Sequence, residues 1–230
     1  YKMIVTGLDS NREDIIEWWL DNALKHHKTE KIGVWDLGMS SACRNKLERK
    51  YKQVWFSEVI DGHIPLHEKK IGWYYKIHCV KESPEQSVVW VDSDCQILTD
   101  ISDIFHLVPA GKIGLTKDWG RSNWWATGVI VVNDRPSLLD TWHERLWTPD
   151  EYGELIRGDQ EALNDLIGTG EHEQIVELPQ EYQWLRASLN RGIKSDNVKV
   201  IHWTGAPGKK FINEVLMKGG KYTGQQVDTL

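Results

Sequence analysis

The sequence predicts a single α/β domain with a mostly parallel central sheet and helices on both faces. Two observations support this fold class. Short runs rich in β-branched residues alternate along the 230 residues with longer segments of helical periodicity, which is the order of a parallel sheet with crossover helices. There is also no internal repeat, low-complexity tract or linker, so one domain is expected at 1–217, followed by a loosely ordered glycine-containing tail at 218–230.

The predicted strands are short apolar or β-branched runs bounded by turn residues. The strand at 87–91 (S-V-V-W-V) is almost wholly apolar and short, as expected for a buried central strand. The segment at 117–127 is rich in tryptophan and polar residues and is expected to be a loop. Strands are predicted at 2–6, 31–35, 53–56, 87–91, 113–116, 129–133, 174–178 and 198–202.

The predicted helices show capping signals at their ends. The first has Ser10 and Asn11 as N-cap candidates, acidic residues in its first turn, and cations near 26–28 at its end. The helix before the central strand ends ahead of Ser83-Pro84, where proline disfavours a further turn. Helices are expected at 10–28, 41–50, 66–81, 136–147 and 159–167.

Composition excludes several classes of function. The net charge is −6 and no basic run is present, which argues against nucleic acid as a partner. Three cysteines without a C-x-x-C pair indicate reduced thiols, and a cytoplasmic location is expected. No signal peptide or apolar run of about 20 residues is visible, so no membrane span is expected. The chain opens at Tyr1 rather than Met, and this is interpreted as the start of a processed product or of a domain from a larger chain.

Two acidic residues follow the buried strand directly, in the triplet Asp92-Ser93-Asp94. Open α/β sheets bind ligands at the carboxyl ends of their strands. Carboxylates two residues apart on extended backbone share one side, so the pair can converge on one divalent cation that bridges to substrate phosphates. The alternative reading is a solvated acidic turn.

A second strand ends in His202 and is followed by a glycine-rich turn with lysines. A neutral imidazole can complete the ligand shell of Mn²⁺ or a similar metal. Gly205 and Gly208 would let the backbone approach a diphosphate, and Lys209 or Lys210 would neutralise its charge. The alternative is a histidine with a purely structural role.

Four motifs in order resemble the family-8 glycosyltransferases, the glycogenin and galactosyltransferase group. They are V-W-V-D-S-D-C, T-G-V-I-V-V-N, G-D-Q-E-A-L-N and I-H-W-T-G-A-P-G-K-K, and the resemblance spans about residues 2–210. It implies a GT-A (Rossmann-like) fold, a UDP-sugar donor such as UDP-glucose or UDP-galactose, Mn²⁺ or Mg²⁺ as cofactor, and transfer to a glycan or other hydroxyl acceptor with retention of configuration.

The resemblance also implies roles for individual residues. The metal ligands would be Asp92, Asp94 and His202, with Asp92 also touching the ribose and Ser93 completing the donor-binding triplet. Diphosphate would be bound by Gly205 and by Lys209 or Lys210, because the family's lysine position, six residues after the histidine, is Gly208 here. The catalytic residues would be Lys76, which would also bind the donor through its phosphate or sugar, and Asp159 and Gln160, which would contact the donor sugar. Uracil and ribose would be held by Thr6, Gly7 and Asp9.

Other readings of the same residues stay open at this point. Lys76 could be a solvated helix lysine and Asp159 a helix N-cap. An inverting enzyme would need a carboxylate base, for which Asp118 and Glu151 are candidates, and the pair Trp124-Trp125 could contact the acceptor or belong to the core. Competing functions are a sugar nucleotidyltransferase, which would release pyrophosphate, and a tryptophan-rich carbohydrate-binding module that has no need of metal.

Overall fold

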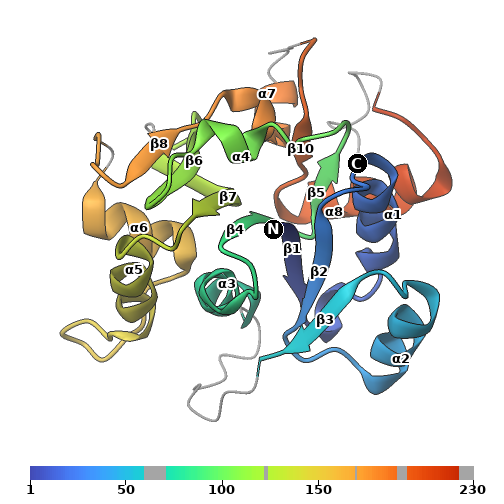
Figure 1. Cartoon of the computed structure of the whole chain (residues 1–230), viewed down its shortest axis with the longest axis horizontal. Helices are drawn as coiled ribbons and strands as arrows, with labels where there is room; N and C mark the ends of the chain where they lie inside the picture. The colour runs from blue at the N-terminus through green and yellow to red at the C-terminus, as the bar shows by residue number, and fades with distance from the viewer. Residues whose placement is uncertain (60–70, 122–123, 169, 191–195, 223–230) are drawn as a thin grey trace.

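The computed structural model describes residues 1–59, 71–121, 124–168, 170–190 and 196–222. Within them, a seven-stranded sheet forms the centre of the molecule (Figure 1). Its order is β3-β2-β1-β4-β7-β6-β8, and β7 is antiparallel to both β4 and β6 while the other neighbours are parallel. The strands are β1 (Lys2–Leu8), β2 (Lys31–Asp36), β3 (Trp55–Glu58), β4 (Ser87–Val91), β6 (Lys112–Asp118), β7 (Trp124–Asn133) and β8 (Ile175–Glu177). The predicted mostly parallel sheet is confirmed.

Helices cover both faces of this sheet, as predicted. Successive strand residues point to opposite sides, and since both sides of the central strand are apolar, each needs a covering layer. In β4, Val89 and Val91 join one apolar cluster while Val88 and Trp90 join another. The first cluster lies under α1 (Ile16–His26), α2 (Ser41–Lys50) and α4 (Ile104–Leu107). The second lies under α3 (Ile71–Glu82), α5 (Leu138–Trp147) and α6 (Asp159–Ile167), which gather at the left and lower centre of Figure 1.

A small second sheet joins distant parts of the chain. It has the order β5-β10-β9, with β5 (Cys95–Ile97) antiparallel and β9 (Trp184–Leu185) parallel to β10 (Val200–His202). Beside it lie α7 (Arg186–Asn190) and α8 (Gly205–Glu214), with short 3-10 turns at Ser10–Arg12, Gln180–Tyr182 and Leu216–Lys218. The pairing of β5 with β10 matters for function, because β5 begins one residue after the D-S-D triplet.

Three sequence-based expectations differ from the structure. The segment 117–127 is a tight hairpin rather than a long loop, because β7 begins at Trp124 and pairs with the end of β6. The first helix begins at Ile16, after a 3-10 turn whose N-cap is Asp9 rather than Ser10 or Asn11. The glycine-rich turn after His202 is the first turn of α8.

The position of Gly208 explains the last difference. A Cβ on this residue would lie 2.2 Å from the carbonyl oxygen of Trp203, so glycine lets α8 pack directly on the end of β10.

Two further expectations fall partly on residues outside the described ones, namely the start of the helix at 66–70 and the tail at 223–230. The two-residue and three-residue strands β9 and β5 were not predicted, since runs so short carry no periodicity.

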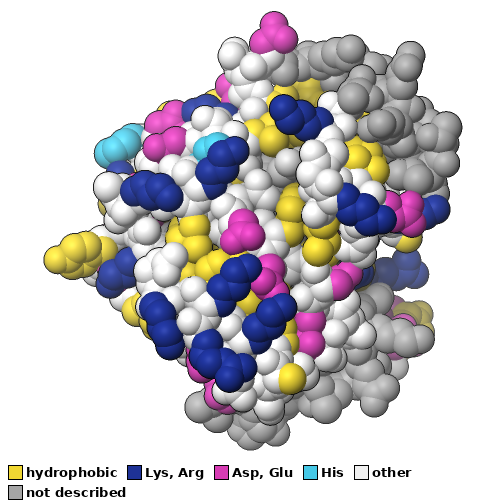
Figure 2. All heavy atoms as spheres, turned by 90° about the vertical axis from the view of Figure 1, so that its right-hand side faces the viewer, with side chains coloured by type: hydrophobic (Ala, Val, Ile, Leu, Met, Phe, Trp, Pro, Cys, Tyr) yellow, Lys and Arg dark blue, Asp and Glu magenta, His cyan; other side chains and the backbone are white. Residues whose placement is uncertain are grey.

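Charges of both signs are interleaved on the face formed by α1 and α2 (Figure 2). Glu17 of α1 pairs with Lys46 and Lys50 of α2, and Arg44 reaches Glu48 at 2.6 Å.

None of the helices in the described part of the chain combines the length and apolar character needed to cross a bilayer.

Candidate active site

The D-S-D triplet forms a tight turn at the carboxyl end of β4, in the middle of the sheet. The amide of Asp92 donates to the carbonyl of Gly128 at 2.8 Å, and the amide of Cys95 donates back to the carbonyl of Asp92 at 2.9 Å. The turn reverses the chain into β5. It therefore presents the carboxylates of Asp92 and Asp94 at the edge where the sheet passes from parallel to antiparallel pairing.

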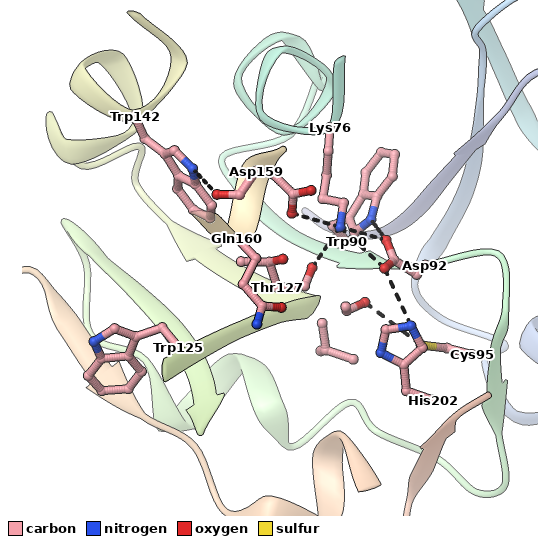
Figure 3. Close-up of polar contacts among 12 residues, drawn as sticks. Lys76, Trp90, Asp92, Cys95, Trp125, Thr127, Trp142, Asp159, Gln160 and His202 are labelled. Atoms are coloured by element: carbon pink, nitrogen blue, oxygen red, sulfur yellow. Dashed lines mark hydrogen bonds and ion pairs between the residues drawn. The ribbon is translucent and has the colours of Figure 1, made fainter. Parts of the chain in front are cut away.

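Lys76 is buried and holds two carboxylates together (Figure 3). Its Nζ lies 2.9 Å from Oδ1 of Asp92 and 2.9 Å from Oδ2 of Asp159, and it donates to the carbonyl oxygen of Thr127 at 3.0 Å. Burial alone would lower the pKa of Lys76, but the charges of Asp159 and then Asp92 raise it above its usual value. The reading of Lys76 as a solvated helix lysine is therefore wrong.

His202 meets the triplet from the small sheet. Its Nε2 lies 3.1 Å from Oδ1 of Asp94 and 3.7 Å from Oδ2 of Asp92. The backbone explains this meeting, because His202 is the cross-strand partner of Cys95 and the amide of Trp203 donates to the carbonyl of Asp94 at 3.0 Å. The two segments that the sequence singled out are thus brought together.

A glycine in β7 makes room for the imidazole. A Cβ on Gly128 would lie 2.3 Å from Nδ1 of His202, far inside van der Waals contact. Gln183 lies beside the same glycine and accepts the amide of Val129 at 2.6 Å. In the motif T-G-V-I-V-V-N, the carbonyl oxygen of Thr127 therefore accepts a hydrogen bond from Lys76, and the missing side chain of Gly128 leaves room for His202.

Lys209 is the lysine that reaches the site. Its Nζ lies 3.2 Å from Oδ2 of Asp94, whereas Lys210 is exposed on the next position of α8. Burial alone would raise the pKa of Asp94, but the charges of His202 and Lys209 lower it below its usual value. The pKa of His202 is raised: burial alone would lower it, but the effect of Asp94 is stronger.

The donor set fits a divalent cation. Two ligand atoms bound at about 2.1 Å to one ion can lie at most about 4.2 Å apart, and both contacts of His202 with the carboxylates meet that limit. Single ligand atoms of Asp94, Cys95 and His202 also lie within 4.8 Å of one another. Burial raises the pKa of Cys95, and its Sγ lies 3.8 Å from the carbonyl oxygen of Gly128. Asp94 and His202 therefore belong to the candidate group, and Oδ2 of Asp92, 3.7 Å from the imidazole, is a further oxygen beside it.

Asp159 and Gln160 begin α6 on the other side of the site. Burial raises the pKa of Asp159, although Lys76 opposes this effect. The backbone oxygen of Asp159 accepts the indole N–H of Trp142 at 2.9 Å, which fixes the start of the helix. Nε2 of Gln160 donates to Asp118 at 3.1 Å. Asp118 is therefore close to the site, whereas Glu151 is exposed in the loop between α5 and α6.

The residues predicted around the base contribute unequally. Thr6 is fully buried in β1, so its side chain is not accessible to a nucleotide, and Asp9 accepts the amide of Asn11 at 2.8 Å in the next turn. Gly7 allows close packing, since a Cβ there would lie 2.8 Å from the ring of Trp90. Of the remaining predicted residues, Ser93 is half-buried within the triplet and Gly205 is exposed at the first turn of α8.

Comparison with known proteins agrees with this geometry. No family model matches the chain. It is 26% identical to glycogenin-1 of Mus musculus over 200 residues, an alignment covering 81% of this chain and 58% of that protein, and equally identical to glycogenin-1 of Homo sapiens, of which 55% is covered. The chain thus spans little more than half the length of the curated relatives it matches.

Solved structures show the same architecture. The galactosyltransferase LgtC, in complex with donor and acceptor sugar analogues, superimposes with a TM-score of 0.67 at 14% identity over 99% of each chain. The glycosyltransferase GlyE of Streptococcus pneumoniae TIGR4 gives 0.69 at 15% identity over 90% of this chain and 55% of its own. This is the GT-A fold. The resemblance to the family-8 glycosyltransferases that the motifs indicated is confirmed.

Several residues of this GT-A site were not predicted from the sequence. The indole N–H of Trp90 donates to Oδ1 of Asp92 at 2.7 Å, so the strand residue two positions earlier orients the carboxylate. Gly128 leaves space for the ring of His202, and the carbonyl of Thr127 accepts a hydrogen bond from Lys76. Their motif had been noticed, but the reason for a glycine there lies in a contact with a residue far along the chain.

Proposed function

We propose that this chain is a metal-dependent glycosyltransferase that moves a hexose from a UDP-sugar, of the UDP-glucose or UDP-galactose type, to an acceptor hydroxyl. The observation that carries the proposal is the approach of His202 to Asp94 and Asp92, at 3.1 and 3.7 Å, among charged side chains that are 12–20% exposed. Similarity to glycogenin-1, and a fold shared with a galactosyltransferase that binds donor and acceptor sugar analogues, support it.

Asp92, Asp94 and His202 would hold Mn²⁺ or Mg²⁺. When bound, such an ion supplies positive charge to the diphosphate that leaves. Lys209 lies next to Asp94 and can add a second positive charge on the same leaving group. The buried ammonium of Lys76 fixes the carboxylates of Asp92 and Asp159 in one orientation, so that the donor meets a preformed surface.

The transfer breaks the bond between the anomeric carbon and the β-phosphate oxygen, and the bonding electrons leave with UDP. The acceptor oxygen forms the new bond, and its proton passes to the leaving phosphate oxygen. If both events occur on one face, the anomeric configuration is retained, as the family-8 resemblance implies. Asp118, the nearby candidate for an inverting base, accepts hydrogen bonds from Gln160 at 3.1 Å and from the amide of Gly120 at 2.9 Å.

The test is turnover of UDP-glucose and UDP-galactose with Mn²⁺, followed as UDP release with and without acceptors. Asp94→Ala and His202→Ala are each expected to lower turnover at least about 100-fold, and to weaken Mn²⁺ binding measured by electron paramagnetic resonance. Asp140→Ala is the matched control, because Asp140 is an exposed carboxylate paired with Lys81 on the outer side of α5. Chelation of the metal should abolish turnover in the unmodified protein.

Three outcomes would contradict this proposal. Undiminished turnover in both variants would remove the metal site from the mechanism. Release of pyrophosphate from UTP and a hexose 1-phosphate would indicate a nucleotidyltransferase, while glycan binding that survives chelation, without any turnover, would indicate a binding module.

A further inference from the structure

Two of the thirteen tryptophans are exposed, and one of them adjoins the candidate site. Trp119 is 44% exposed at the hairpin between β6 and β7, and Trp73 is 47% exposed on α3. The other eleven are buried or half-buried. An indole left this far in water forgoes a large part of the stabilisation its apolar surface would gain by burial, so its exposure calls for an explanation.

Trp119 stands on a turn that is fixed to α6. The preceding residue, Asp118, accepts hydrogen bonds from the side chain of Gln160 at 3.1 Å and from the amide of Gly120 at 2.9 Å. Arg121 pairs with Glu161 at 2.8 Å. The turn is thus tied on both sides of Trp119 to residues that directly follow Asp159 in the chain.

The indole of Trp119 also packs against the small sheet that carries His202. Its ring packs edge-on against Trp184, with centroids 5.6 Å apart and planes 78° apart, and Trp184 is 5% exposed. Trp184 belongs to β9, in which Leu185 is the strand partner of His202. Trp119 therefore lies between α6, which carries Gln160, and the small sheet, which carries His202. Its contact with the buried Trp184 limits the movement of its ring.

We infer that Trp119 is the platform on which a pyranose ring of a saccharide acceptor stacks. A fixed, half-exposed indole offers a flat apolar surface to the C–H face of a sugar. The carboxylate of Asp118 and the amide of Gln160 beside it supply the few polar groups that would orient ring hydroxyls. The inference rests on the proposed function and adds the acceptor class, a saccharide rather than a peptide hydroxyl.

The test separates acceptor binding from donor binding. Acceptor KM and UDP-sugar KM are measured with Mn²⁺ for a panel of maltose, cellobiose and lactose, and for serine-, threonine- and tyrosine-containing peptides. Trp119→Ala is expected to raise the KM of a disaccharide acceptor about tenfold while the UDP-sugar KM changes less than about twofold. Trp119→Phe keeps a flat ring against Trp184 and should stay within about threefold of the unmodified protein. Tyr152→Ala, which removes an aromatic side chain that is 82% exposed in the loop between α5 and α6, is the control.

A second measurement needs no turnover. Titration with the accepted disaccharide should quench or blue-shift the emission of the exposed indole, and Trp119→Phe should abolish that change. An unchanged disaccharide KM in Trp119→Ala, or peptides used as acceptors while every disaccharide fails to exceed the rate of UDP-sugar hydrolysis, would overturn the inference and leave the proposed function standing. Saccharide binding that depends on Trp119, without UDP-sugar turnover under any condition, would instead sink the proposed function.

Discussion

Replacing Lys76 with methionine should show how much one buried charge contributes to the stability of the protein. The side chain of Lys76 is 4% exposed, and its ammonium lies 2.9 Å from carboxylate oxygens of Asp92 and Asp159, whose side chains are 20% and 6% exposed. Methionine fills much of the same volume but brings no charge. The variant therefore leaves two carboxylates facing each other in a site that water hardly reaches.

The expected cost follows from this burial. Removing one partner of a buried ion pair destabilises a protein by about 3–5 kcal/mol, because the remaining charge is left without compensation. In a chain of this size, 1 kcal/mol corresponds to about 2–4 °C in the melting temperature, so Lys76→Met should melt at least about 6 °C lower. Exposed pairs such as that of Lys81 with Asp140, whose carboxylate is 72% exposed, should change stability by about 1 kcal/mol at most when broken.

The assay is urea unfolding of the unmodified protein, Lys76→Met and the double variant Lys76→Met/Asp159→Asn. Neutralising Asp159 removes one of the two uncompensated charges and with it their mutual repulsion, so the double variant should recover at least about 1.5–2.5 kcal/mol of the loss. The pH dependence gives a second check. Burial already raises the pKa of Asp159, and loss of the ammonium raises it further. The folded variant then binds a proton that the unfolded chain lacks, so its deficit should be smaller at pH 5 than at pH 8.

Two results would refute this reasoning. A free energy of unfolding within about 0.5 kcal/mol of the unmodified protein would show that Lys76 is not the electrostatic centre of the site. A double variant no more stable than Lys76→Met would show that the loss comes from packing rather than from unpaired carboxylates.

Two further predictions concern Gly128 and Lys209, which adjoin the proposed metal ligands. Gly128→Ala should displace the ring of His202, because the new Cβ would lie 2.3 Å from Nδ1, and Mn²⁺ affinity measured by calorimetry should fall at least about tenfold. Gly72→Ala on α3, where a Cβ has its nearest neighbour at 3.9 Å, is the matched control and should leave Mn²⁺ affinity unchanged. Lys209→Ala should strengthen Mn²⁺ binding to the nucleotide-free protein about threefold and weaken UDP binding in the presence of Mn²⁺ about tenfold, and weaker Mn²⁺ binding would contradict the competition between lysine and cation at Asp94.

The parts of the fold that could be predicted from the sequence are those whose signal is local. The buried strand β4 and the two acids after it stand within eight consecutive residues, Ser87 to Asp94, so the placement of Asp92 and Asp94 at a strand end required no tertiary information. The alternation of strands and helices likewise predicted the parallel sheet. The hairpin at Trp119 was predicted as part of a longer loop, because tryptophan and polar residues in a strand end resemble a turn when the pairing partner is unknown.

The approach of His202 to the triplet depends on contacts that no local pattern contains. It requires the pairing of β5 with β10, each three residues long, and a residue without a side chain at position 128. Strands this short carry no period, and the reason for Gly128 exists only once the histidine lies against it. The family resemblance indicated that these motifs act together, whereas the burial of Lys76 and the packing of Trp119 against Trp184 became visible only in three dimensions.

Under the proposed function, one set of charged residues would serve the protein both without and with the bound cation. Three carboxylates, Asp92, Asp94 and Asp159, face the ammonium groups of Lys76 and Lys209 and the imidazole of His202, so they are compensated before any ligand arrives. Lys76 is buried and bound to two of them, and it can stay in place throughout. Lys209 is 24% exposed and holds a single oxygen of Asp94, so a divalent cation can take over that oxygen and release the lysine toward an incoming diphosphate. The same side chain would then stabilise Asp94 in the empty site and the leaving group in the occupied one, which is why its removal should affect cation and nucleotide binding in opposite directions.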